Sequence, residues 1–430
     1  MPPEIEQFLK EFFQQLNDRS LNPGDKLYVP LYENHELFED DPVQILARGI
    51  EWTPGSSVQL LSGFRGTGKS TELRRLRKRL QDSGYVVVLC DIEDYTNLTT
   101  PVDLSDFLLA MAGALGDNLK DQGLLNKDPA HEDYWTRFQN FLTRTKVEFA
   151  EAAGEHSGIT LKASLKSDPS FKQKLQRRMQ GHIGAFIDDI KTYIADCVKL
   201  VKQSTTEDTE VVLLMDSIEH IRGTHANASE VHASVNTLFS GHADKLHIPQ
   251  LHIVYTIPPF LKVMHPNLGS LYDPGELQVL PAVNPKEPKA VEALRELIRK
   301  RGDWAKLLPD QDSLDQLITF SGGHLRDLLK LIGAVVRRAA KLPVDKNTVE
   351  NAINQIRSEF LPIANDDARW LQDVSETKLS GLEDAEKLPD LARFLDTHMI
   401  LCYRNGKEWY DVHPLIAKHV ADQVNKTQSQ

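Results

Sequence analysis

The chain contains the stretch Gly63-Phe64-Arg65-Gly66-Thr67-Gly68-Lys69-Ser70-Thr71, directly after the apolar residues Val58 to Leu61. It matches the phosphate-loop pattern G-x-x-x-x-G-K-[ST], which is expected between a buried strand and a helix. The glycines let the backbone curve so that successive N–H groups point at phosphate oxygens. A helix that begins near Lys69 would add its positive N-terminal end. The stretch therefore predicts a strand, a nucleotide-binding turn and a helix, in that order.

This loop, a Walker A pattern, predicts the ligands as well as the turn. Lys69 is expected to reach the β- and γ-phosphates of a nucleoside triphosphate, and the Ser70 hydroxyl is expected to ligate Mg²⁺. We predict ATP with Mg²⁺, because the N/T-K-x-D motif that reads guanine does not stand out. The predicted nucleotide-binding residues are Gly63, Arg65, Gly66, Thr67, Gly68, Lys69, Ser70 and Thr71. The alternative, a glycine-rich turn that matches by accident, fits poorly with strand, loop and helix in order.

The composition is that of an ordinary globular chain. Of the 430 residues, 26% are charged and 40% are hydrophobic, and the length suggests roughly three domains. The formal net charge of −12 argues against broad nonspecific attraction to nucleic acid or an anionic membrane. The three cysteines, Cys90, Cys197 and Cys402, are scattered and suggest neither a disulfide framework nor a zinc site. Without a cationic leader or a bilayer-length apolar run, we expect a cytoplasmic protein.

A parallel sheet covered by helices is predicted around the loop. The five expected strands are short apolar segments: Val58–Leu61, Tyr85–Cys90, Val211–Met215, Leu251–Thr256 and Leu277–Leu280. Helices expected at 70–82 and near 103–116 separate some of these segments, as in a doubly covered sheet. The connection between the second and third strands is unusually long. Expected helices near 131–151 and 171–203, with a short strand at 159–165, predict a helical insertion at about 119–205.

The two ends of the chain are predicted to be mostly helical. Amphipathic spacing predicts a helix at 5–16, and another is expected at 42–52. The helices expected after the sheet lie at 286–302, 311–320, 323–341, 346–359, 366–376 and 383–398. Two strands, 399–404 and 408–412, then flank the turn Asn405-Gly406, the strongest short hairpin signal, before a last helix from Pro414 through Ala421. The predicted domains are a helical segment 1–50, a nucleotide-binding domain 51–285, a helical lid 286–365 and a winged-helix-like domain 366–430.

A second acidic motif is predicted to complete the metal site. Asp216 ends the apolar strand 211–215, a Walker B pattern, and would orient Mg²⁺ beside Ser70, directly or through water. Ser217 follows where many ATPases place their catalytic glutamate. The next acid, Glu219, is expected to polarise the attacking water. Alternatively, Glu219 is only an acid at a helix start.

The loop 63–71, the Asp216-x-x-Glu219 spacing, the predicted lid and the predicted winged helix resemble STAND-type signalling NTPases. They also look similar to AAA+ ATPases of the origin-recognition class. In STAND proteins a small residue commonly follows the Walker B aspartate, and the functional acid lies three positions on, as Glu219 does. The resemblance covers most of residues 40–425. It implies an α/β, parallel-sheet P-loop NTPase core (ASCE type) with a helical insertion, a helical lid and a C-terminal winged-helix-like domain.

The resemblance implies two more nucleotide-contacting residues. Thr256 ends the strand 251–256, which looks like the sensor 1 strand, and would bond the γ-phosphate or the attacking water. Alternatively, Thr256 is an ordinary β-branched strand residue. Arg326 follows Gly322-Gly323 as in the sensor 2 helix of these relatives, and would face the nucleotide with its planar donor fork. Alternatively, Arg326 pairs at the surface with Asp327 or Asp315.

Other nucleotide contacts are less well marked. Arg222 and Arg301 carry no diagnostic arginine-finger pattern, so a finger would come from a neighbouring subunit of a homo-oligomer or from a partner. The segment 27–31 is a weak candidate for the adenine border, and plain packing is the alternative. Seven histidines between His220 and His265 repeat no zinc-ligand spacing.

Two functions follow from these motifs. One is a regulatory ATPase switch of low turnover that controls a separate effector protein, as in bacterial antiviral defence signalling, since no effector domain or repeat is visible. The other is an origin-recognition-like or transposition-type ATPase that loads on DNA. The supposed wing, 404–407, has two cations, and the preceding unit carries Asp384, Glu386, Asp390 and Asp396. That acidity is a poor match for phosphate and favours the switch.

Overall fold

The computed structural model describes residues 1–125, 183–224, 226–382 and 384–428, together with the single positions 166, 173 and 177. The predicted helix near 131–151 and strand 159–165 lie outside the described residues. The described chain forms two compact units. The sheet unit comprises residues 43–62 and 72–278, and the lid unit comprises residues 1–42, 63–71 and 279–430. Each unit is considered by itself below.

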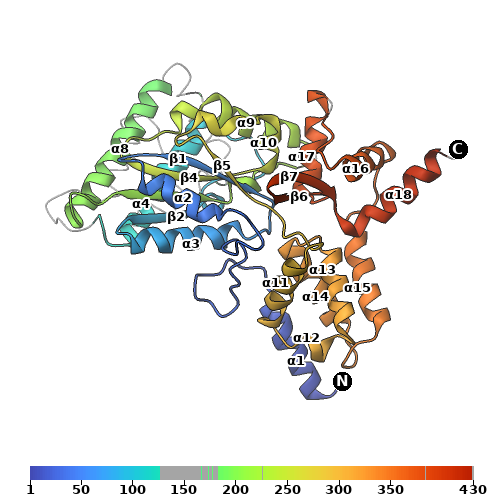
Figure 1. Ribbon diagram of the computed structural model, residues 1–430. Helices are drawn as coiled ribbons and strands as arrows, with labels where there is room; N and C mark the ends of the chain where they lie inside the picture. Colours follow the sequence, from blue (N-terminus) through green and yellow to red (C-terminus); the bar gives the residue numbers. More distant parts are fainter. Residues whose placement is uncertain are drawn as a thin grey trace. The chain divides into compact units, whose positions relative to one another are not determined.

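A five-stranded sheet is the centre of the sheet unit (Figure 1). Its strands are β1 (Val58–Gly63), β2 (Val86–Asp91), β3 (Val211–Asp216), β4 (Leu251–Ile257) and β5 (Leu277–Leu280), in the order β2-β3-β4-β1-β5. The pairs β2–β3, β3–β4 and β4–β1 are parallel. Every residue of β1, β3 and β4 is buried, as expected for strands covered on both faces. All five predicted strands and the predicted α/β P-loop fold class are confirmed.

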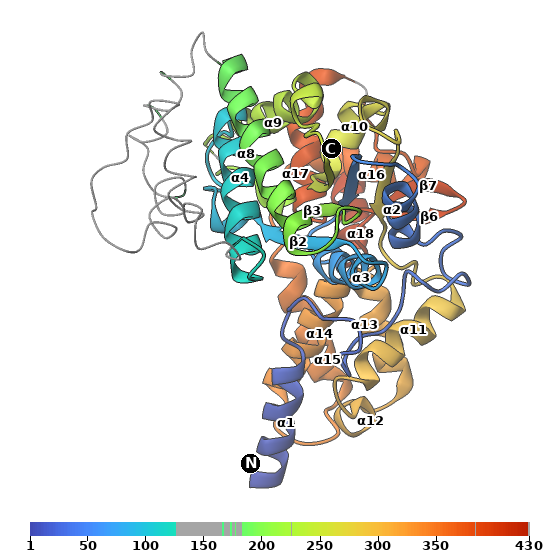
Figure 2. The same ribbon diagram turned by 90° about the vertical axis from the view of Figure 1, so that its left-hand side faces the viewer.

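Helices and short turns flank this sheet. They are α2 (Pro42–Glu51), α3 (Lys69–Asp82), α4 (Leu104–Asp121), α8 (Ile183–Ser204), α9 (Ala228–Asn236) and α10 (Pro259–Met264), with 3-10 turns at Ile92–Asp94 and Ile218–His220. Helix α4 packs against β2 and lies side by side with α8 (Figure 2). Helix α8 corresponds to the described part of the helix predicted near 171–203, and its residues Phe186, Ile190, Ile194, Cys197 and Val201 are buried. Neither α9 nor α10 was predicted, because each is too short to show a clear period.

The lid unit contains a group of helices with the N-terminal helix beside it. They are α1 (Pro3–Gln15), α11 (Pro288–Arg299), α12 (Trp304–Leu307), α13 (Gln311–Phe320), α14 (Leu325–Arg338) and α15 (Lys346–Ser358). Helix α1 packs along α14 (Figures 1 and 2). Asp303, Asp310 and Asp345 cap α12, α13 and α15 through their carboxylates, which satisfies N–H groups that lack a partner within the helix.

The C-terminal part of the lid unit contains α16 (Asn365–Thr377), α17 (Leu388–Asp396), β6 (Ile400–Asn405), β7 (Lys407–Val412) and α18 (Pro414–Gln428). Strands β6 and β7 form the predicted antiparallel hairpin around Gly406. Helix α17 is shorter than the predicted 383–398, because Pro389 is tolerated only in a first turn. The last helix runs to Gln428 instead of Ala421. The domain boundaries given above stay predictions.

Among the described residues, no helix is both long enough and apolar enough to cross a membrane.

Candidate nucleotide site

The phosphate loop is a closed turn stabilised by its own side chains. Strand β1 ends at Gly63, α3 begins at Lys69, and Gly63, Gly66 and Gly68 all have positive φ. The Thr67 hydroxyl donates a 2.9 Å hydrogen bond to the Phe64 carbonyl. Lys69 is 3% exposed, and its Nζ donates to the carbonyls of Gly63 and Phe64, each at 2.8 Å. The ammonium therefore lies within the curve of the loop.

The N-terminal end of α14 contacts this loop directly. The Arg326 N–H donates to the Gly66 carbonyl at 3.3 Å, and His324 Nε2 lies 2.9 Å from the Arg65 carbonyl. Gly66 has φ +94°, and a Cβ added there would lie 2.6 Å from the Arg326 Cβ. Only glycine fits this position, because both the backbone conformation and the close approach exclude a side chain.

The Arg326 side chain forms an ion pair with the Asp18 carboxylate, just beyond α1. The two partners considered from the sequence are engaged elsewhere: Asp315 accepts from Arg295 at 2.5 and 2.7 Å, and Asp327 faces three histidines. The alternative of pairing with Asp327 or Asp315 is therefore wrong. The predicted sensor role of Arg326 stays a prediction, with its side chain beside Gly66.

The N-terminal segment also meets the loop. The Tyr32 hydroxyl lies 3.0 Å from the Thr67 carbonyl and 2.9 Å from the Pro281 carbonyl, and the Leu21 N–H donates to Thr71 Oγ1 at 3.1 Å. Tyr32 follows the segment 27–31, for which an adenine contact or plain packing was predicted, and that prediction stays untested. The sequence signal for Tyr32 was a tyrosine directly after the apolar segment 27–31.

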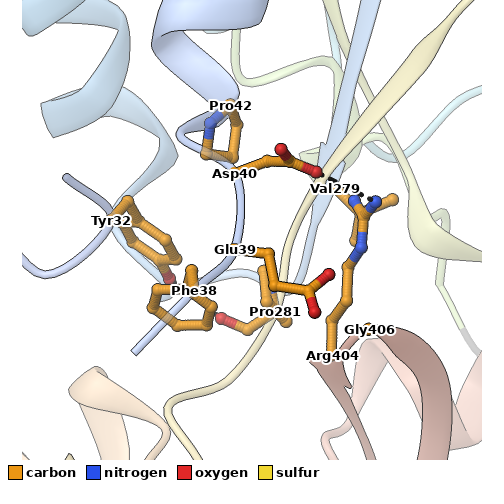
Figure 3. A pocket seen from close by; sticks show the side chains of 9 residues that line it. All are labelled: Tyr32, Phe38, Glu39, Asp40, Pro42, Val279, Pro281, Arg404 and Gly406. Atoms are coloured by element: carbon orange, nitrogen blue, oxygen red, sulfur yellow. Dashed lines mark hydrogen bonds and ion pairs between the residues drawn. The ribbon is translucent and has the colours of Figure 1, made fainter. Parts of the chain in front are cut away.

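A pocket of about 310 Å³ lies next to Tyr32 (Figure 3). Its lining consists of Tyr32, Phe38, Glu39, Asp40, Pro42, Val279, Pro281, Arg404 and Gly406. The Tyr32 and Phe38 rings stack with centroids 5.0 Å apart, and Arg404 forms a 3.8 Å ion pair with Asp40. With two carboxylates against one guanidinium, the pocket is poorly suited to a phosphate.

In the sheet unit, Asp216 and Thr256 lie at the carboxyl edge of the sheet. Met215 pairs with Tyr255 across β3 and β4, so the next residue of each strand is at the same level. Asp216 is 6% exposed and accepts from the Ser217 N–H at 2.9 Å. Ser217 adopts a left-handed φ of +67°, and the following Ile218 N–H donates to Thr256 Oγ1 at 3.1 Å. The structure thus joins Thr256 to the turn that carries Asp216 and Glu219.

Glu219 is also buried, at 8% exposed. One of its oxygens lies 3.8 Å from His220 Nε2, and His220 Nδ1 contacts Glu93. Asp91 is the register neighbour of Asp216 on β2. Desolvation raises the pKa of Asp91, against hydrogen bonds from Glu93 and Ser217, although the residue keeps an exposed surface.

Asp91 and Glu93 were not among the predicted site residues. The signal was an acid directly after the second strand, in the same position as Asp216 after the third. Because the carboxyl ends of parallel strands share one edge of the sheet, an acid in that position is expected to lie near Asp216.

The predicted site residues therefore fall into two groups. The lid unit holds the loop residues and Arg326, and the sheet unit holds Asp216, Glu219 and Thr256. Strand β1 ends at the same edge as β3 and β4, since Ser62 pairs with Ile257, and the loop follows β1 in the chain. Arg301, which was considered as an arginine finger, is buried. It donates hydrogen bonds to the carbonyls of Leu27 and Leu297, and burial lowers its pKa to about 10.

Comparison with known proteins gives only remote likenesses. No protein-family model matches the chain, and no curated protein matches it. Three similar solved structures are the Aeropyrum pernix ORC2 protein in its ADP form, the Walker-type ATPase of Pyrococcus abyssi and Cdc6p from Pyrobaculum aerophilum. Their identities are 12%, 16% and 11%, and their TM-scores are 0.45, 0.39 and 0.40. The matches cover 97%, 90% and 93% of this chain and 98%, 96% and 96% of theirs. Likenesses this remote assign no activity, ligand or partner to the chain.

Proposed function

We propose that the chain is a regulatory ATPase that binds Mg·ATP at its phosphate loop, hydrolyses it slowly and thereby controls a separate effector protein. The observation that carries the proposal is the contact between the loop and the start of α14, through the carbonyls of Arg65 and Gly66. A triphosphate in the loop would meet the positive end of that helix. Binding would therefore act on the lid as well as on the loop.

Each predicted site residue has a role in this proposal. Lys69 holds the β- and γ-phosphates, and Ser70 and Asp216 hold Mg²⁺. Glu219 polarises the attacking water, and Thr256 orients the water or the γ-phosphate. The remaining loop residues, Gly63, Arg65, Gly66, Thr67, Gly68 and Thr71, wrap the phosphates with their N–H groups.

Arg326 supplies the switch in this proposal. Its guanidinium pairs with the Asp18 carboxylate next to the loop. A γ-phosphate offers the same oxyanion chemistry with more charge, so it competes with Asp18 for Arg326. After hydrolysis the γ-phosphate is lost, and Asp18 regains the arginine. The difference in free energy between these two pairings biases the lid.

The effector is proposed to be a separate chain, as in bacterial defence signalling, and an arginine finger would come from that chain or from a second copy of this one. The hairpin tip favours this output over DNA. Arg404, one of the two cations there, is paired with Asp40, which leaves little positive charge for a phosphate backbone. A mobility shift with duplex DNA over a salt series compares the two outputs, since phosphate contacts give a steep loss of affinity with salt.

The test is calorimetric titration with Mg·ATP combined with a turnover assay. Lys69→Ala should abolish nucleotide binding, whereas Glu219→Gln should keep binding and lose turnover. Lys78→Ala, an exposed lysine on α3, and Glu230→Gln, an exposed acid on α9, are the matched controls and should behave as wild type. No uptake of Mg·ATP by the wild-type chain would refute the ATPase, and normal turnover in Glu219→Gln would refute only the assigned acid.

A further inference from the structure

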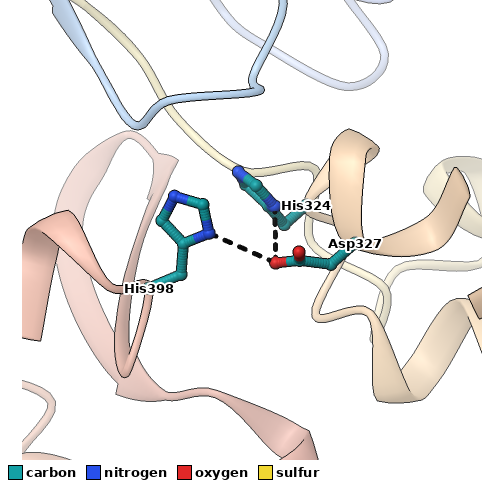
Figure 4. A group of neighbouring side chains, drawn as sticks. All are labelled: His324, Asp327 and His398. Atoms are coloured by element: carbon teal, nitrogen blue, oxygen red, sulfur yellow. Dashed lines mark hydrogen bonds and ion pairs between the residues drawn. The ribbon is translucent and has the colours of Figure 1, made fainter. Parts of the chain in front are cut away.

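Three histidines converge on one carboxylate inside the lid unit. Figure 4 shows two of them, His324 and His398, with Asp327. His324 Nδ1, His398 Nδ1 and His413 Nε2 lie 2.7, 3.3 and 3.4 Å from the same oxygen, Asp327 Oδ2. His324 and His413 are fully buried, Asp327 is 3% exposed and His398 is 9% exposed. None of the four is assigned a contact with the nucleotide, although His324 also bonds the Arg65 carbonyl of the phosphate loop.

The proton positions leave a lone pair of His324 facing this carboxylate. Its Nε2 must carry a hydrogen, because its partner at 2.9 Å is the Arg65 carbonyl, which can only accept. In the neutral ring, Nδ1 is then bare, yet it lies 2.7 Å from the Asp327 oxygen without the direction of a hydrogen bond. Two electron-rich atoms at this distance require either a second proton on the ring, which makes it an imidazolium, or a metal cation beside both atoms.

His398 occupies an unusual backbone position. It follows α17 with a left-handed φ of +59°, where helices usually place glycine. For a residue with a Cβ this conformation is energetically costly. The cost is offset if the side chain is needed where it lies, with its ring centroid 4.1 Å from that of His324.

His413 supports the carboxylate instead of joining the cation. The Leu415 N–H donates to His413 Nδ1 at 3.2 Å, so in the neutral ring the hydrogen lies on Nε2, which is 3.4 Å from Asp327 Oδ2. The geometry therefore brings a nitrogen of His324, a nitrogen of His398 and the Asp327 carboxylate together.

We propose that His324 Nδ1, Asp327 and His398 Nδ1 bind one divalent transition-metal ion of the zinc class. The three donor atoms all lie within 4.8 Å of one another. Zinc bonds of about 2.0–2.2 Å in tetrahedral geometry place ligand atoms about 3.3 Å apart. The 3.3 Å between His398 Nδ1 and Asp327 Oδ2 matches this value, and the 2.7 Å between His324 Nδ1 and Asp327 Oδ2 is shorter. The Arg65 carbonyl then fixes the His324 tautomer, as outer-shell acceptors do for metal-bound histidines.

Such an ion would join three parts of the lid unit. Two ligands, His324 and Asp327, belong to the start of α14, and His398 lies between α17 and β6. Through His324 the ion is one hydrogen bond from the phosphate loop. The proposal does not depend on the ATPase, because the site is complete without a nucleotide.

The test uses the full chain after treatment with a chelator and dialysis, with no nucleotide present. Titration with Zn²⁺ should show one tight site per chain, and Co²⁺ should give the visible absorption of tetrahedral coordination. His398→Gln should lose far more than the roughly 10–100-fold of an outer-shell change, and His413→Gln should lose about 10–100-fold. His232→Gln, a buried histidine of the sheet unit, is the matched control and should bind as wild type.

His398→Gln is the decisive variant, because Asp327→Asn removes a buried charge and threatens folding. Failure of the wild type to bind Zn²⁺ or Co²⁺ in stoichiometric amount would overturn the site, and the cluster would then be an imidazolium–carboxylate network. Equal zinc affinity in wild type and His398→Gln would overturn it as well, since the ion would be bound elsewhere.

Discussion

Gly323 shows how strongly single residues constrain the start of α14. It has a φ of +68°, and an added Cβ would lie 1.6 Å from the Val283 carbonyl oxygen. We predict that Gly323→Ala lowers the free energy of unfolding by about 1–3 kcal/mol more than Gly24→Ala, because of this overlap. Gly24 is the matched control, with φ +89° and nothing within 4 Å of its added Cβ.

Urea unfolding of the two alanine variants measures this difference. Gly24→Ala should lose only the cost of a left-handed alanine, about 1–2 kcal/mol. Equal losses in both variants would mean that the Val283 segment moves away at no cost, and the close packing described here would be wrong.

His252 makes the sheet unit sensitive to acid. It is fully buried, and its Nδ1 lies 2.8 Å from Ser57 Oγ, while Nε2 lies 3.3 Å from Glu210. Desolvation lowers the pKa of His252, against the opposing charge of Glu210. In the unfolded chain the pKa is about 6.5, so below this pH the unfolded state binds the additional proton. Stability from this group is therefore present above pH about 6.5 and is lost as the pH falls.

We predict that protonation of His252 lowers the free energy of unfolding of the wild type by up to about 1.4 kcal/mol for each pH unit below about 6.5. Chemical unfolding at several pH values checks it: His252→Asn should show a shallower acid slope than wild type, and His419→Asn, an exposed histidine, should not. Parallel slopes in wild type and His252→Asn would contradict the prediction.

The site residues differ in how far the sequence could predict them. Lys69 and Ser70 follow from a local pattern, because a phosphate loop needs those residue types at fixed spacing. The Arg326–Asp18 pair joins residues 308 positions apart, and nothing in the sequence marks Asp18 as the partner. The cluster of His324, His398 and His413 around Asp327 could not be predicted for the same reason, because tertiary packing and not sequence spacing brings these residues together.

At the scale of elements, Arg301, two residues beyond the end of α11, connects this helix to the N-terminal segment. Its guanidinium donates to the carbonyls of Leu27 at 3.3 Å and of Leu297 at 2.9 Å, and the side chain is buried. We predict that Arg301→Ala costs about 1–3 kcal/mol, since the buried carbonyl of Leu27 loses a charged donor. Lys300→Ala removes an exposed bond to the Tyr28 carbonyl and should stay within about 0.5 kcal/mol of wild type.

Denaturant unfolding of both variants gives these values. Equal stability of Arg301→Ala and Lys300→Ala would show that water replaces the guanidinium, and Arg301 would then be available for another role, such as the finger.

Elements were predicted well where local chemistry decides them. Apolar runs gave all five strands, and Asn405-Gly406 gave the hairpin. Errors had two causes. Pro389 must lie in the first turn of a helix, so α17 begins later than predicted. Helices α10 and α9, of six and nine residues, are too short to show a clear amphipathic period. A helix boundary depends on the cap, which amphipathic spacing does not encode.

At the scale of the whole molecule, the phosphate loop groups with the lid unit and not with the sheet unit. The sequence predicted it inside the nucleotide-binding domain, because the loop joins β1 to α3. The structure adds hydrogen bonds from Tyr32, His324 and the Arg326 N–H to loop carbonyls. If the loop binds a nucleotide as proposed, these hydrogen bonds connect that binding to the start of α14.

That linkage leads to a prediction for the intact chain. If Mg·ATP binds only the folded form, it should raise the free energy of unfolding by about 2.7 kcal/mol at a concentration of 100 times Kd. Protection of backbone amides from hydrogen exchange should increase both in the loop 63–71 and at the start of α14, because the two are bonded to each other.

Hydrogen exchange with and without Mg·ATP, read segment by segment, measures both effects. Lys69→Ala should show neither, and Lys78→Ala should show both. Protection confined to the loop, with 325–330 unchanged in wild type, would separate nucleotide binding from the lid. In that case ATP could still bind, but competition between the γ-phosphate and Asp18 for Arg326 could not be the switch. Nucleotide binding would then leave the stability of α14, the helix that carries Arg326, unchanged.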